Sequence, residues 1–272
     1  MLVLFTENAR QQAGGNPSDC SDTSGLMTYV YQNVNSMDAA FQRSQIPAQV
    51  GVVTVARLNG YTLIPYNYNV ATIYQNRDSI QQSSSIRQFR DLVGVDVVST
   101  LVDTQTNLGT CGVAYIQRPD CGGGGSVSGC GSGPLFSNWT YLLETIQCAV
   151  VDTFTHEVGH VLGAEHDAAH TGANSATASF PYSFGYGYPV AGSGFETIMS
   201  QQFNATYYPT RLLQFSNPYV AWQGHPTGNG ASAYNALTLT NLLPGTAAYR
   251  SRPDLIFASG FDQANTCSGI NF

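Results

Sequence analysis

A stretch of twelve residues constrains this chain more than any other part of it. Residues 156–167 read His-Glu-Val-Gly-His-Val-Leu-Gly-Ala-Glu-His-Asp. His156 and His160 are four residues apart, so on a helix they lie one above the other and both imidazoles can reach a single ion. Gly163 can end the helix in a left-handed conformation and turn the chain so that His166 returns toward that ion. The stretch therefore predicts a helix, a sharp turn and three nitrogen ligands around one metal.

The apolar residues of this stretch favour the same helix. At about 100° per residue, they form a buried stripe, and the histidines fall roughly opposite it with Glu157 beside them. Asp152 is a candidate N-cap and Gly163 a candidate stop, so a short, bounded helix is expected. The stripe consists of Phe154, Val158, Val161 and Leu162.

The residue types indicate the chemistry. Three histidine ligands leave zinc an open position, which is typical of catalytic sites, whereas structural sites add a fourth protein ligand. We therefore expect one catalytic Zn²⁺ held by His156, His160 and His166. Glu157 is expected to be the catalytic general base, taking a proton from the attacking water and passing it to the leaving amine.

The H-E-x-x-H-x-x-G-x-x-H pattern resembles that of the metzincin zinc endopeptidases. Asp167, directly after the third histidine, resembles the residue at that position in the reprolysin (adamalysin-like) branch. Metzincins carry a methionine turn beneath the metal. Residues 197–200, Thr-Ile-Met-Ser, resemble this turn and place Met199 in it. Astacins and serralysins have a tyrosine two residues after that methionine. Gln201 stands there in this chain, so no tyrosine role is carried over.

Weaker similarities extend along most of the chain. Residues 90–98 and 111–115 resemble the helix-to-strand passage and the edge strand of this group, and residues 215–218 and 224–236 resemble the C-terminal segment of bacterial secreted reprolysin-like peptidases. The resemblance implies an endopeptidase whose extended polypeptide substrate lies antiparallel to an edge strand. The residues implied for that strand are Gly112, Val113 and Ala114.

Hydrophobic patterning predicts an α/β (α+β) fold. Strands are expected at 2–5, 49–57 and 95–102, and helices at 26–41 and 86–92, which implies a mixed sheet before the zinc helix. Residues 168–200 and 221–235 are rich in Gly, Ala, Ser, Asn and Pro and are expected to be mostly loops.

Together with the resemblance, this predicts one metzincin-like catalytic domain of two parts. An N-terminal subdomain, residues 1–163, would hold a mixed twisted sheet with helices and end in the zinc-binding helix. A smaller, irregular C-terminal subdomain, residues 164–272, would supply the third ligand and the methionine turn. The zinc cleft would lie between the two parts.

Composition limits the partners. The chain has 272 residues, of which 43% are hydrophobic, enough to bury a substantial core. A formal net charge of −7 argues against nucleic acid or an anionic membrane as the main partner. No apolar run approaches the length of a membrane span. We expect a polypeptide substrate, no nucleic acid or membrane partner, and a monomer.

The six cysteines form an even set without any C-x-x-C pair, which favours disulfide bonds in an exported protein over six free thiols. Fifteen connectivities are open. Cys121–Cys130 is favoured because it would close a Gly-rich loop, Cys20–Cys267 would tie the two ends of the chain together, and Cys111–Cys148 would then remain. Residues 1–5 are too short for an export signal. We therefore expect a secreted protein whose leader, and any propeptide, is absent from this chain.

Two other functions compete with an endopeptidase. The metal could have a purely structural role and stabilise a loop-rich binding module, although a structural site has no need of Glu157. A zinc hydrolase acting on a non-peptide amide is the other alternative. His170 and His225 lie outside the metal pattern and are expected at the surface. The Gly-rich run 121–130 lacks the lysine of a phosphate-binding loop and is expected to be a surface loop.

Overall fold

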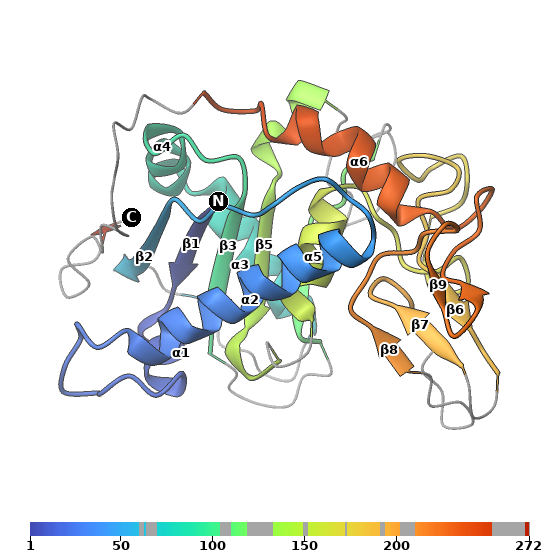
Figure 1. Ribbon diagram of the computed structural model, residues 1–272. Coiled ribbons are helices and arrows are strands. Elements are labelled where there is room, and N and C mark those ends of the chain that lie inside the picture. The colour runs from blue at the N-terminus through green and yellow to red at the C-terminus, as the bar shows by residue number, and fades with distance from the viewer. Residues whose placement is uncertain are drawn as a thin grey trace.

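The computed structural model describes residues 1–59, 63, 70–103, 110–118, 133–148, 152–171, 173–190, 194–201, 210–251 and 270–271. A six-stranded sheet in the order β11-β2-β1-β3-β5-β4 dominates this part of the chain (Figure 1). Neighbouring strands are parallel except for β4, which runs antiparallel to β5 at the edge. The strands are β1 (Leu2–Phe5), β2 (Thr54–Asn59), β3 (Val98–Val102), β4 (Gly112–Ala114), β5 (Tyr141–Thr145) and β11 (Ile270–Asn271).

Helices cover both faces of this sheet. The long helix α2 crosses the front face in Figure 1 and contacts α5, which also packs on β4 and β5. Helix α3 packs on the same two strands and contacts α4. The helices are α1 (Glu7–Gln12), α2 (Ser24–Arg43), α3 (Val70–Gln82), α4 (Ser84–Leu92), α5 (Thr153–Val161) and α6 (Asn235–Thr246), with 3₁₀ turns η1 (Gly133–Asn138) and η2 (Ile146–Cys148).

The core lies on both sides of the sheet because side chains alternate along each strand. In β1, Val3 and Phe5 pack in a cluster with residues of α1 and α2. Leu2 and Leu4 belong to a second cluster, which includes residues of α3 and α4. A strand buried on both faces is an unbroken apolar run, as Leu-Val-Leu-Phe is here.

A smaller region follows the end of α5, to the right in Figure 1. It contains a three-stranded sheet in the order β6-β7-β8 and a hairpin of β9 and β10. Two hydrogen bonds join this region to the residue after α2, from Phe215 N–H to Ser44 Oγ at 2.7 Å and from Asn217 Nδ2 to Ser44 O at 2.8 Å. The strands are β6 (Gly187–Tyr188), β7 (Phe195–Thr197), β8 (Thr210–Leu212), β9 (Ala221–Trp222) and β10 (His225–Pro226).

The structure confirms the mixed α/β architecture, with corrections to its elements. The strand expected at 49–57 runs over 54–59, and the one expected at 95–102 begins at Val98. The delay has a physical cause, since the carbonyls of Val95 and Asp96 accept hydrogen bonds from buried Arg90 before the ladder starts. The region expected to be mostly loops also contains short strands. Division of the chain at residue 163 stays a prediction.

Several elements were not anticipated, namely α1, α3, α6 and β5. Side-chain caps fix two of the helix starts: Thr6 accepts from Ala9 N–H before α1, and Ser83 accepts from Ile86 N–H before α4. Within the residues described above, no helix is both long and apolar enough to cross a membrane.

Candidate metal centre

Helix α5 and the turn after it bring three imidazoles together. His156 and His160 project from successive turns of α5. Gly163 then adopts φ 86°, the left-handed conformation anticipated for it, and the chain returns so that His166 faces both rings. Its Nε2 atom lies 2.9 Å from Nε2 of His156 and 3.1 Å from Nε2 of His160. All three candidate ligand atoms lie within 4.8 Å of one another.

Hydrogen bonds orient two of these rings. His156 Nδ1 donates to the carbonyl of Ile198 at 2.9 Å, and His160 Nδ1 donates to that of Ala164 at 2.8 Å. A carbonyl only accepts, so each Nδ1 carries the proton and each Nε2 presents its lone pair to the centre. This is the orientation that histidine ligands need.

The charge state of the rings also suits a metal. Burial lowers the pKa of His156 to about 3 and lowers the pKa values of His160 and His166 as well. Three neutral imidazoles with lone pairs facing one another at such distances repel each other. A divalent cation among them would replace that repulsion by attraction. The donor set therefore fits a three-nitrogen metal site.

Glu157 lies in the same cleft as the histidines. Its carboxyl group packs on the backbone of Gly112, where an added Cβ would stand 2.8 Å from Glu157 Oε1. Burial, and then the nearby carboxyl of Glu144, raise the pKa of Glu157 to about 8. A cation held by the histidines would lower it again. The metal-free cleft therefore favours the protonated acid at neutral pH, and a bound cation would favour the ionised form, which can accept a proton.

A cleft of about 480 Å³ opens onto these groups. Strand β4 forms one wall, so the implied edge-strand residues Gly112, Val113 and Ala114 lie beside the three imidazoles and Glu157. The volume is typical of a ligand-binding cleft. Its other lining residues are Tyr74, Thr110, Cys111, Ile116, Asp152, Thr153, His170, Gln201 and Arg211.

Met199 lies fully buried against the metal-site helix. A Cβ added to Gly159, in the middle of α5, would stand 2.9 Å from Met199 Sδ. The loop carrying His166 is joined to the turn at residues 197–200 through Asp167. The N–H of Asp167 donates to Met199 O at 3.2 Å, and the Oδ2 atom of Asp167 accepts from Gln201 N–H at 2.7 Å. The turn and the third imidazole are therefore one connected unit.

Asp167 stays ionised in this position. Burial alone would raise the pKa of its carboxyl, but hydrogen bonds from Gln201 N–H and from the ring of His170 hold the pKa below its usual value. His170 lies at the rim of the cleft, with its Nδ1 atom 2.7 Å from Asp167 Oδ1. His225, the other histidine outside the motif, is exposed and stacks on Tyr188. Gln201 points its Nε2 atom to within 3.2 Å of His166 Nε2.

Asp152 is the N-cap residue of α5, as expected, but its side chain makes no capping hydrogen bond. Its Oδ2 atom instead accepts from Arg211 Nε at 2.7 Å. Arg211, on β8, also pairs with Glu196 at 2.9 Å and donates to the carbonyls of Ile198 and Ser200. The sequence pattern did not single out Arg211.

A second arginine supports the segment between the second and third imidazoles. Arg118 makes two hydrogen bonds to the carboxylate of Glu165, at 2.5 Å through Nε and 2.8 Å through Nη2. Glu165 is fully buried and also accepts from Thr171 Oγ1 at 3.0 Å. This bidentate pair holds the backbone one residue before His166.

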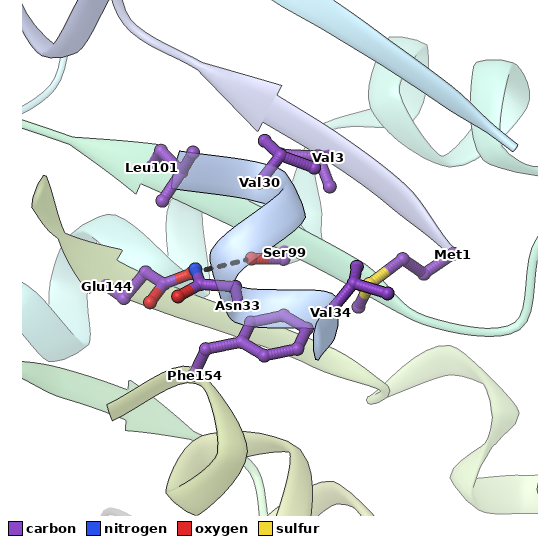
Figure 2. Close-up of a pocket in the computed structure, with 9 residues that line it drawn as sticks. All are labelled: Met1, Val3, Val30, Asn33, Val34, Ser99, Leu101, Glu144 and Phe154. Carbon is purple, nitrogen blue, oxygen red and sulfur yellow. Dashed lines mark hydrogen bonds between the residues drawn. The ribbon is translucent and has the colours of Figure 1, made fainter. Parts of the chain in front are cut away.

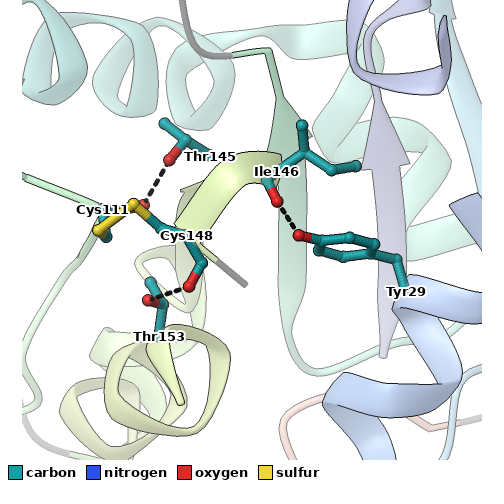
Figure 3. The surroundings of a disulfide bond; sticks show 6 residues. All are labelled: Tyr29, Cys111, Thr145, Ile146, Cys148 and Thr153. Carbon is teal, nitrogen blue, oxygen red and sulfur yellow. Dashed lines mark hydrogen bonds between the residues drawn. A yellow bond between two sulfur atoms is a disulfide. The ribbon is translucent and has the colours of Figure 1, made fainter. Parts of the chain in front are cut away.

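A disulfide between Cys111 and Cys148 confirms one expected pairing (Figure 3). It joins the residue before β4 to the end of η2, close to the start of α5. Thr145 Oγ1 donates to the Cys111 carbonyl at 3.2 Å, and Thr153 Oγ1 to that of Cys148 at 3.1 Å. Cys20 is also disulfide-bonded. Cys121, Cys130 and Cys267 lie outside the described residues, so the other two pairings stay predictions.

The carboxyl group of Glu144 is fully buried and lies close enough to Glu157 to affect its pKa. Glu144 Oε1 accepts from Asn33 Nδ2 at 3.1 Å and from Ser99 Oγ at 3.4 Å (Figure 2). Its Oε2 atom has no hydrogen-bond partner among the described residues. Burial raises the pKa of Glu144 to about 8. A cavity of about 10 Å³ adjoins it, walled mainly by apolar side chains that include Val3, Val30, Leu101 and Phe154.

A mixed α/β sheet with three neutral imidazoles and a carboxylic acid in one cleft is typical of a metal-dependent hydrolase. Residues 1–216 match the model of Metallo-peptidase family M12, Reprolysin_5, and the chain belongs to this family. The members of this family are metal-dependent peptidases. The metzincin resemblance of the His-Glu motif is thereby confirmed.

Sequence relatives agree with this family. The chain is 39% identical over 99 residues to a peptidyl-Asp metalloendopeptidase of Stenotrophomonas maltophilia (strain K279a). The aligned region covers 36% of this chain and 22% of the relative. A protein of the same name from Pseudomonas aeruginosa is 27% identical over 209 residues, covering 74% of this chain and 31% of the relative. The chain thus spans less than a third of the length of either curated relative.

The fold also recurs among solved structures. A structure described as a chaperone–substrate complex superposes with a TM-score of 0.62, covering 92% of this chain and 38% of that chain. At 14% sequence identity, this likeness concerns the fold alone.

Proposed function

We propose that this chain is a secreted, monomeric zinc endopeptidase that hydrolyses internal peptide bonds of extended polypeptides. The observation that carries the proposal is the convergence of His156, His160 and His166 in one cleft with Glu157. Membership in Metallo-peptidase family M12 supports peptide hydrolysis as the reaction. The even cysteine set, with the Cys111–Cys148 bond, supports export.

In this proposal the three histidines hold Zn²⁺ through Nε2. When bound, zinc supplies a Lewis acid that activates water and polarises the scissile carbonyl. Glu157 takes the proton as the water oxygen bonds to the carbonyl carbon, and then delivers it to the amide nitrogen as the C–N bond breaks. Met199, packed under α5, serves as the methionine turn. Residues 1–163 and 164–272 form the two sides of the catalytic domain.

Strand β4 is the proposed binding edge for the substrate. It pairs with β5 on one side only within the described sheet, and its other side faces the cleft. A peptide added antiparallel to β4 would be recognised by backbone hydrogen bonds, which suit many sequences. Selectivity would then come from side-chain pockets along the cleft.

The name peptidyl-Asp metalloendopeptidase, which both relatives carry, specifies aspartate. We extend this preference to the present chain as part of the proposal. A pair of fluorogenic peptides that differ only by Asp or Asn beside the scissile bond tests it. Faster hydrolysis of the Asp peptide is expected, and equal rates would remove the preference while leaving the endopeptidase proposal intact.

A fluorogenic peptide library, assayed with and without a chelator, tests the main proposal. Internal cleavage that chelator abolishes and added Zn²⁺ restores is expected. A chain that binds zinc but cleaves no peptide would instead be a zinc-stabilised binding module. Hydrolysis of simple amides without peptide cleavage would indicate the non-peptide hydrolase.

A further inference from the structure

Arg211 and His156 share one hydrogen-bond acceptor. The carbonyl oxygen of Ile198 accepts from His156 Nδ1 at 2.9 Å and from Arg211 Nη2 at 2.6 Å. Arg211 lies on β8, whereas His156 lies on α5, so the carbonyl joins two elements that are far apart in the sequence. The orientation of the first imidazole therefore depends on a carbonyl that the arginine also holds.

The guanidinium of Arg211 spans the methionine turn. Its Nη2 atom binds the Ile198 carbonyl, and its Nη1 atom binds the Ser200 carbonyl at 3.0 Å, so the residues on both sides of Met199 are fixed. Two carboxylates hold the guanidinium in turn, Asp152 at 2.7 Å through Nε and Glu196 at 2.9 Å through Nη1. The side chain is only 29% exposed.

Through this network, Arg211 holds the carbonyl group to which His156, a proposed metal ligand, donates its Nδ1–H. A ligating histidine keeps its ring orientation through the hydrogen bond at its other nitrogen, and loss of such partners typically weakens metal binding or activity by about 10- to 100-fold. The planar fork of arginine can hold two carbonyls and two carboxylates at once. Lysine offers a single ammonium group and cannot reproduce that geometry.

We propose that Arg211 is the positioning residue that sets His156 for metal binding, by holding the Ile198 and Ser200 carbonyls in place. The proposal rests on the zinc endopeptidase function proposed above. It assigns to Arg211 a role in metal affinity that is separate from its contribution to folding. Asp152 takes part by holding the Arg211 guanidinium, and its side chain makes no capping hydrogen bond to α5.

The test compares Arg211→Lys with a matched control, Arg10→Lys. Arg10 is fully buried, pairs with Glu7, and donates to the carbonyls of Asn16, Asp19 and Asp22, and none of these residues lines the cleft. Both substitutions keep the charge and remove an arginine fork. Zn²⁺ affinity is measured by chelator competition, and the site geometry by the visible absorption of the Co²⁺-loaded chain. Circular dichroism verifies folding, and Arg211→Gln replaces Arg211→Lys if the latter does not fold.

We expect Arg211→Lys to bind Zn²⁺ about 10- to 100-fold more weakly and to change the Co²⁺ spectrum, while Arg10→Lys keeps the parent affinity and spectrum. Parent-like zinc affinity in Arg211→Lys overturns the proposal, and so does an equal loss in Arg10→Lys. A variant that keeps its zinc affinity and changes only the ratio of Asp to Asn peptide cleavage would make Arg211 a specificity residue instead. A parent chain that binds zinc but cleaves no peptide overturns only the endopeptidase function, whereas a parent that binds no zinc overturns both.

Discussion

The carboxyl group of Glu157 lies directly against the backbone of Gly112, and no side chain larger than hydrogen fits between them. A Cβ at Gly112 would stand 2.8 Å from both Cγ and Oε1 of Glu157, and 2.8 Å from Cγ2 of Thr153. The proposed base and the proposed substrate strand are therefore in contact. Any displacement of one is transmitted to the other.

Gly112→Ala should lower kcat strongly while zinc affinity stays near that of the parent. The added methyl group forces Glu157 away from its position, and misplacement by about 1 Å can cost about 100-fold in rate. Steady-state kinetics and chelator competition measure the two effects. Gly230→Ala is the matched control, because a Cβ there meets no atom within 4 Å. Parent-like kcat in Gly112→Ala would show that the contact has no catalytic importance.

Glu157→Ala should retain metal and lose peptide hydrolysis. The substitution leaves the three imidazoles in place and removes the group that moves the proton, a contribution of about 100- to 10,000-fold in rate. Metal content by atomic absorption and turnover of a fluorogenic peptide check the two statements together. Full activity with bound zinc would refute the assignment of Glu157 as the base.

Removal of the Cys111–Cys148 bond should destabilise the chain. The bond links residues 37 apart, for which the chain-entropy model gives about 4 kcal/mol of unfolding free energy. Urea unfolding of the Cys111→Ala, Cys148→Ala double variant measures the loss. Because Cys111 immediately precedes β4, we also expect KM to rise as the strand loses its anchor. An unchanged unfolding midpoint would contradict the prediction.

Stability of the metal-free chain should fall as pH rises from about 6.5 to about 8; below about 6.5 the three neutral histidines act in the opposite direction, because only the unfolded state takes up protons on them there. The folded pKa of Glu144 is about 8, above its ordinary value of 4.5, so the folded state holds a proton that the unfolded state has released. The stabilisation is fully present below 4.5 and is lost as pH rises through 8, at up to about 1.4 kcal/mol for each pH unit.

Glu144→Gln tests this dependence, because the amide cannot ionise. Urea midpoints of the variant, measured in chelator, should depend less on pH over the same window. Glu7→Gln is the comparison, since a hydrogen bond from Arg10 lowers the pKa of Glu7 and that substitution removes a stabilising ion pair instead. A parent-like slope in Glu144→Gln would rule out Glu144 as its source.

The part of the site that could be predicted from sequence is the part encoded locally. The first two histidines and Glu157 lie on one helix, and Gly163 explains the turn to His166, so spacing alone indicates their convergence. Arg211 is different. It meets Asp152 across 59 residues of sequence, and a contact of that kind leaves no periodic signal. Gly112 was reached through the family resemblance and not through its own pattern.

The elements that escaped prediction carry polar residues where apolar ones are expected. Strand β5 includes Glu144, which is fully buried. Helix α3 buries Asn76, Arg77 and Gln81, and Arg77 donates to the Ala114 carbonyl on β4. Such positions break the hydrophobic periodicity on which sequence patterning relies. By contrast, β1 is apolar throughout and was predicted with its observed bounds.

Because β4 is an edge strand of the sheet, its position limits which polypeptides this peptidase would hydrolyse. A chain can align with that strand only after its own amide groups are released from other partners. Compact globular targets keep those groups engaged internally. Linkers, flexible tails and denatured proteins would be hydrolysed first, and a native domain would resist hydrolysis until it unfolds.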